Sequence, residues 1–134
     1  EKLGRPAHWH TRLAAINPGD VATLLRLSKA DTIEFTRIRE GALSEQTPSA
    51  MGYEVGGELA IEALMLREVL TGQPVTQDAM DAAHFANLQV FPVKADHLMP
   101  TYEGKALGAR LAYLKSEWIK STFAMTKADL LALP

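Results

Sequence analysis

The chain has 134 residues, of which 47% are hydrophobic and 22% are charged, and this is the size and composition of one ordinary globular domain with a real core. The formal net charge is −2, so the chain as a whole lacks the basic character of a nucleic-acid-binding domain, and any contact with RNA must use a local basic face. The sequence contains no Cys, which excludes disulfides and thiolate chemistry, and no apolar run of the roughly 20 residues that a membrane span needs.

Helix signals follow one another along the first half of the chain. Asn17 resembles a helix cap, and the apolar spacing after it predicts a helix to about Arg37. Residues 41–53 combine several helix-breaking residues without a period, so a loop is expected there. A second long helix is expected over about residues 55–71, with Gly72 as its stop. Its apolar residues form one stripe, consisting of Leu59, Ala63, Leu66 and Leu70.

The second half is more strongly patterned. Thr76 is expected to cap a helix to about Asn87, and a short helix is expected over residues 95–99. The clearest helix runs from about Gly104 to Ser121, and Thr126 begins a capping box that starts a last helix. The core-facing stripe of the clearest helix consists of Leu107, Leu111, Leu114 and Trp118.

No segment shows the alternation of apolar and polar residues that is typical of a strand. The predicted fold is therefore all-α, a bundle-like array of about five to seven helices. Residues 1–89 form a body-like segment and residues 90–134 a tail-like segment. Glu1 rather than Met opens the sequence, which is compatible with a segment of a longer chain.

Two motifs suggest metal or nucleotide chemistry, but their surroundings favour structural roles. His8 and His10 are two residues apart, which on a helix places them on different faces, and no carboxylate follows at ligand spacing. Gly56 and Gly57 precede a helix, as in nucleotide-binding heads, but the Arg-Asp pair and the metal-binding carboxylates of such heads are missing. We predict glycines at a helix entrance or a close helix crossing, with no metal site and no catalytic residue.

Gly104 and Lys105 stand at the start of the clearest helix. They lack the upstream glycine and the following Ser or Thr of a loop that binds nucleoside triphosphates. A helix N-terminus beside a cation suits a single backbone phosphate instead. Projection at about 100° per residue is expected to place Lys105, Arg110 and Lys120 away from the Leu-Trp stripe, and this basic face is either an RNA contact or an ordinary solvated surface.

The C-terminal half resembles the tail of class II tRNA nucleotidyltransferases, the superfamily of CCA-adding enzymes and bacterial poly(A) polymerases. The resemblance covers about residues 90–132 and is carried by Phe91-Pro92-Val93, Gly104-Lys105-Ala106-Leu107-Gly108, Leu111, Leu114, Trp118, Ser121, Phe123 and Lys127-Ala128-Asp129-Leu130-Leu131. Upstream, the stretch Leu24–Thr32, LLRLSKADT, resembles the body helix of that family, in which a leucine-rich run ends in Arg-Ala-Asp.

The resemblance implies an all-helical body and tail that grip the acceptor stem and T-arm of tRNA through the sugar-phosphate backbone. The catalytic head and the neck, which use Mg²⁺ with ATP or CTP, would lie before Glu1, so this segment itself would need no cofactor. The implied setting is the bacterial cytoplasm or an organelle, without a membrane. The expected RNA contacts are Lys94, Gly104, Lys105, Arg110 and Lys120, with Arg26 and Lys29 as weaker candidates on the body helix.

The sequence departs from the family at one corner. Where the family has Ser-Gly-x-Asp-Leu, this chain has Lys94–Leu98, KADHL, with Ala95 at the glycine position and His97 at the aspartate position. Ala95 would be disfavoured if the corner required a positive φ. This departure and the acidic net charge keep a second hypothesis open, a helical module that retains the tail fold for protein interaction or homo-oligomerisation.

Overall fold

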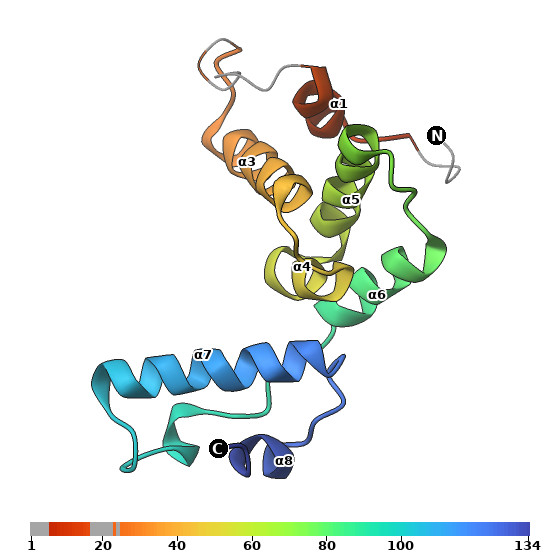
Figure 1. Cartoon of the computed structure of the whole chain (residues 1–134). Coiled ribbons are helices and arrows are strands. Elements are labelled where there is room, and N and C mark those ends of the chain that lie inside the picture. Colours follow the sequence, from red (N-terminus) through yellow and green to blue (C-terminus); the bar gives the residue numbers. More distant parts are fainter. Residues whose placement is uncertain (1–5, 17–22, 24) are drawn as a thin grey trace. The chain divides into compact units, whose positions relative to one another are not determined.

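The structure is a computed structural model that describes residues 6–16, 23 and 25–134. These residues form α-helices, one short 3₁₀ helix and no strand, which confirms the predicted all-α fold (Figure 1). The elements are α1 (Trp9–Ile16), α3 (Lys29–Leu43), α4 (Pro48–Val55), α5 (Gly57–Thr71), α6 (Gln77–Asn87), η1 (Ala95–His97), α7 (Gly104–Lys120) and α8 (Lys127–Leu131).

The chain divides into two compact units, which are described separately. Unit 1 comprises Glu1–Leu88 and unit 2 comprises Gln89–Pro134. The body-like and tail-like segments expected from the sequence meet between residues 89 and 90, one residue from this division.

Helix α5 is the centre of unit 1 and packs against α1, α3, α4 and α6. Every residue from Ala60 to Leu66 is buried, so the expected single stripe describes only part of its contact surface. The far end of the helix is more open, and Leu70 is 49% exposed. Helix α5 ends at Thr71, and Gly72 follows it in the left-handed conformation, with φ 74°, which confirms the predicted stop.

The helix predicted to run from Asn17 to about Arg37 is interrupted at residues 25–28. Its proposed cap, Asn17, lies outside the described residues. Arg26 has a φ of 50°, and Ser28 is extended and accepts a hydrogen bond from the Asp31 amide, so α3 starts afresh at Lys29. The prediction of one continuous helix was wrong, because Ser28 is a good N-cap and starts a new helix although the apolar spacing continues across it.

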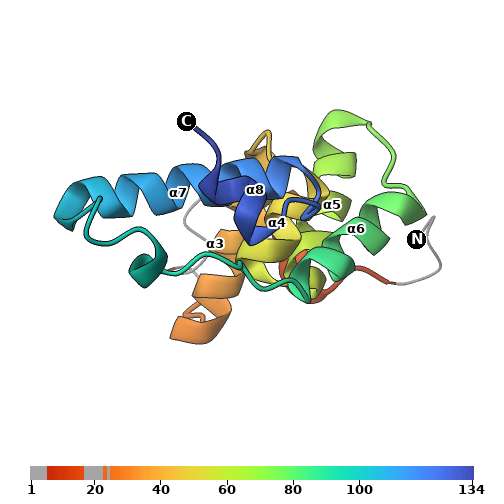
Figure 2. The ribbon, with the colours of Figure 1, turned by 90° about the horizontal axis from the view of Figure 1, so that it is seen from below.

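The loop predicted over residues 41–53 is confined to residues 44–47, and the rest of that range is helical. Helix α3 continues to Leu43, and α4 begins at Pro48, with Thr47 accepting a hydrogen bond from the Ala50 amide. Thr47 and Pro48 are a good cap and a good first helical residue, and the small residues after them allow close packing. Figure 2 shows α4 and α6 side by side. A Cβ on Gly52 would lie 2.1 Å from the main-chain oxygen of Ala83.

The glycine pair at the start of α5 serves the helix junction, as predicted. Gly56 has a φ of 93° and separates α4 from α5, while its carbonyl accepts the Ala60 amide at 3.0 Å. Gly57 lies at the crossing of α5 and α6, where a Cβ would meet His84 Nδ1 at 2.7 Å. Both glycines are therefore explained by backbone conformation and packing.

Unit 2 is built on α7. In Figure 1 the segment after α6 runs alongside this helix before turning back into it. Trp118 is buried and contacts the rings of Phe91 and Phe123, with centroids 5.4 and 4.9 Å away. Leu114 is fully buried, so the predicted stripe faces the core over its second half.

The capped helices of the second half have the predicted starts. Thr76 accepts a hydrogen bond from the Ala79 amide at the start of α6. Thr126 and Asp129 form a reciprocal capping box at the start of α8. The pKa of Asp129 is lowered by its hydrogen bonds to the Thr126 side chain and amide.

Candidate nucleic-acid interface

The start of α7 is open and carries a cation. Gly104 has a φ of 51°, a Cβ added there would meet nothing within 4 Å, and Lys105 beside it is exposed. The preceding Glu103 makes no side-chain capping hydrogen bond, so the N-cap side chain does not cover the first-turn N–H groups of α7. Lys105 has no hydrogen bond or ion pair to another residue in the described part of unit 2.

Lys105 lies opposite the buried face of α7. At about 100° per residue, Leu114 is about 180° from Lys105 around the helix, and Trp118 is about 140° from it. Both of those side chains are buried, whereas Lys105 is exposed. Lys105 therefore lies on the side of α7 opposite the residues that are buried in the second half of the helix.

Arg110 does not occupy that exposed face, and its predicted position was wrong. The guanidinium donates hydrogen bonds to the main-chain oxygens of Pro134, at 2.6 Å, and Leu133, at 2.5 Å. It also lies over the rings of Tyr102 and Tyr113, 5.6 and 5.4 Å from their centroids, and its buried Nε has no partner within the described structure. At about 100° per residue Arg110 is only about 70° from the centre of the Leu-Trp stripe, which explains this structural role.

Lys120 is exposed at the other end of α7, but it is paired. Its Nζ lies 2.7 Å from Oε1 of Glu117, one helical turn away. This hydrogen bond, together with the charge of Glu117, raises the pKa of Lys120. A phosphate would have to compete with a carboxylate for this ammonium group, although surface pairs of this kind are weak.

Lys94 lies at the corner that departs from the family pattern. The backbone there is extended, with φ −110° and ψ 163°, and Lys94 is exposed. Its amide donates to Nδ1 of His97 at 3.0 Å, so the imidazole provides an acceptor that starts η1. Ala95 is not among the residues with positive φ, so a side chain is tolerated at the position where the family has glycine.

Arg26 and Lys29 belong to unit 1. Both are exposed, Arg26 just before the cap of α3 and Lys29 as its first residue. The structure thus places Gly104 and Lys105 at the exposed start of α7, and Lys94 and Lys120 on exposed parts of the same unit. Arg110 is half-buried and is engaged by the last residues of that unit.

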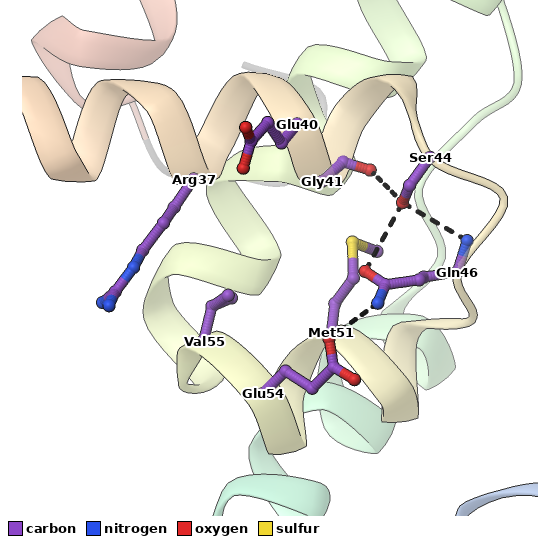
Figure 3. A pocket seen from close by; sticks show the side chains of 8 residues that line it. All are labelled: Arg37, Glu40, Gly41, Ser44, Gln46, Met51, Glu54 and Val55. Carbon is purple, nitrogen blue, oxygen red and sulfur yellow. Dashed lines mark hydrogen bonds between the residues drawn. The ribbon is translucent and has the colours of Figure 1, made fainter. Parts of the chain in front are cut away.

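A pocket in unit 1 was not predicted from the sequence. It lies between the C-terminal end of α3 and α4 and has a volume of about 330 Å³ (Figure 3). Its walls carry Arg37, Glu40 and Glu54, and Met51 and Val55 supply apolar surface. Two carboxylates and one guanidinium give mixed charge, which does not favour a phosphate.

Arg67 is the principal long-range contact that sequence reasoning missed. From α5 it donates to the main-chain oxygens of Gly41 at 2.7 Å, Gln46 at 2.9 Å and Ala42 at 3.3 Å. It therefore satisfies the carbonyl groups at the end of α3 and holds the turn to α4. An arginine inside an apolar helix pattern is the only signal that the sequence offered.

The described residues contain no group of three or more His, Cys, Asp or Glu side chains that could hold a metal ion. No helix in the described ranges is long and apolar enough to span a membrane. No family model, curated protein or solved structure matches the chain.

Proposed function

We propose that this chain is the RNA-binding C-terminal region of an enzyme similar to tRNA nucleotidyltransferases and poly(A) polymerases. In this proposal it positions the acceptor stem and T-arm of a tRNA, while a head domain outside this chain adds nucleotides to the 3′ end. Mg²⁺ and ATP or CTP would be held by that head and its neck. The bacterial cytoplasm, or an organelle, is the setting that the resemblance implies.

The observation that carries the proposal is the exposed Lys105 in the first turn of α7, opposite the buried Leu114 and Trp118. A cation beside uncovered N–H groups of a 17-residue helix suits a backbone phosphate. Recognition of duplex RNA through phosphates and 2′-hydroxyls needs no base-reading side chain. Lys94 on the same unit, and Arg26 and Lys29 on unit 1, would add contacts to the phosphates.

The test is a titration of a labelled acceptor–T-arm minihelix with the native chain and with Lys105→Glu. Loss of one phosphate contact should weaken binding and make the dependence of log K on log salt shallower by about 0.9. The sequence of the minihelix should not change this effect.

Arg37→Glu is the matched control, because it reverses an exposed cation outside the predicted contacts and should leave affinity within about twofold at moderate salt. If Lys105→Glu binds as tightly as the native chain with the same salt dependence, Lys105 is not a phosphate contact.

The second candidate is a helical module for protein interaction or homo-oligomerisation. The net charge of −2 and the altered corner at residues 94–98 favour it. Light scattering that shows a stable dimer, together with no response to the minihelix, would support this candidate over RNA binding.

A further inference from the structure

Tyr113 is an exposed aromatic residue of α7 with a fixed cation against its ring. It is 40% exposed, and the guanidinium of Arg110 lies over the ring, 5.4 Å from its centroid. The hydrogen bonds from Arg110 to the main-chain oxygens of Leu133 and Pro134 hold this cation in place. Because the guanidinium covers one face of the ring, the exposed surface of Tyr113 lies on the opposite face and at the hydroxyl edge.

Exposed lysines lie on both sides of this ring along α7. At 1.5 Å and 100° per residue, Lys105 is about 12 Å before Tyr113 and about 80° around the helix from it, and Lys120 is about 10 Å after it and about 20° away. The hydrogen bond to Glu117 is the main cause that raises the pKa of Lys120, but Tyr113 raises it too, so the phenol lies near this ammonium group. The Glu117 carboxylate, one turn from Tyr113, is paired with Lys120, which offsets its negative charge.

The charge of unit 2 indicates what kind of partner this surface fits. Residues 89–134 contain six Lys or Arg and four Asp or Glu, a net charge of +2, whereas residues 1–88 contain eight against twelve, a net charge of −4. A polyanion is therefore attracted to unit 2 rather than to unit 1. An apolar protein segment would use the ring but not the two ammonium groups, and a duplex keeps its base faces stacked inside the helix. An unpaired nucleic-acid strand offers both phosphates and free base faces.

We propose that Tyr113 stacks on an unpaired base of the bound RNA, while Lys105 and Lys120 contact phosphates on either side of that base. This inference rests on the proposed RNA-binding function and adds the class of RNA, one with an unpaired and unstacked base beside any duplex. Arg110 restricts the ring, so little side-chain freedom is lost when a base stacks on it. Stacking uses the π-face that every base has, so the site should tolerate any base.

The test compares a mixed-sequence RNA strand of about 12 nucleotides, alone and annealed to its complement, as ligands of the whole chain. Tyr113→Ala should weaken binding of the single strand by about 5- to 150-fold, the usual loss for one stacked base. The same substitution should change affinity for the duplex by less than about twofold, because the duplex contacts only the cations. Tyr113→Phe is the matched control, since it keeps the ring and should bind the single strand within about twofold of the native chain.

The ring-proton NMR signals of the native chain give a second readout that needs no variant, because the chain has only three tyrosines. The single strand should shift the Tyr113 signals, and those of Tyr53 on α4 in unit 1 should stay in place.

The outcomes separate this inference from the proposed function. If the native chain binds both RNAs, but Tyr113→Ala binds the single strand equally well or the Tyr113 signals do not shift, stacking is overturned and the phosphate contacts stand. Binding of the single strand through Tyr113, with none of the duplex or of the acceptor–T-arm minihelix, would overturn the proposed function and keep the stacking site. Binding of none of these RNAs would overturn both.

Discussion

Two arginines show how much a single side chain contributes to this fold. Arg67 closes the end of α3 from a helix 21 to 26 residues away, and Arg110 fixes the last residues of unit 2 against α7. In both cases a guanidinium donates to main-chain oxygens, which are otherwise costly to bury. Their roles depend on partners distant in sequence, so residue type and spacing alone did not reveal them.

Arg67→Met tests the first of these roles. Removing the guanidinium leaves the Gly41, Ala42 and Gln46 carbonyls without that donor, which should lower the free energy of unfolding of unit 1 by about 2–4 kcal/mol. Exchange of the α5 amides under native conditions measures this loss.

Arg37→Met is the matched control for Arg67→Met, because Arg37 is exposed on α3. This substitution should change the free energy of unfolding of unit 1 by less than about 0.5 kcal/mol. Equal effects of the two substitutions would refute the role of Arg67 at the end of α3.

Among the helices, capping residues were the sequence signals that best predicted where a helix begins or ends. The threonine caps of α6 and α8, the glycine stop of α5 and the apolar stripe of α7 each led to a helix that the structure contains. Helix α4 was missed because its Ser, Gly and Pro content resembles a loop. Its stability comes from Met51, which is 1% exposed, and from the close approach at Gly52, and neither leaves a local periodic signal.

Gly52→Ala tests the crossing of α4 and α6. The new methyl group would overlap the Ala83 main chain, so the helices must separate, and the free energy of unfolding of unit 1 should fall by about 3 kcal/mol, the upper end of the usual cost of overpacking. Thermal unfolding monitored by amide signals of each unit would measure the change.

Gly108→Ala provides the contrast within α7, because a Cβ there meets nothing within 4 Å. It should stabilise unit 2 by about 0.5–1 kcal/mol, the usual gain from replacing glycine inside a helix. If Gly52→Ala left the free energy of unfolding of unit 1 unchanged, α4 and α6 would not approach each other closely at Gly52.

For the whole molecule, the sequence predicted the fold class and a division into segments, but it left the side-chain partners open. His10, Glu62 and Asp31 lie on three different helices, α1, α5 and α3. The hydrogen bond from the Ser28 hydroxyl, and then that from His10, lowers the pKa of Asp31. The candidate RNA contacts also differ in their side-chain partners. Lys105 is exposed as expected, whereas Lys120 is paired with Glu117 and Arg110 donates to the Leu133 main-chain oxygen. The positions of the cations can be read from the sequence, but tertiary contacts decide which of these side chains remain exposed and unpaired for a phosphate.

RNA binding by the native chain, measured against salt, tests the central proposal most directly. Titration of an acceptor–T-arm minihelix at about 50 and 200 mM salt should give saturable binding, with log K falling against log salt with a slope of about −1.8 or steeper if two or more phosphates are contacted. Light scattering on the same samples should show a monomer that binds RNA. A stable dimer with no saturable RNA binding at about 50 mM salt would contradict the proposal and favour the interaction module.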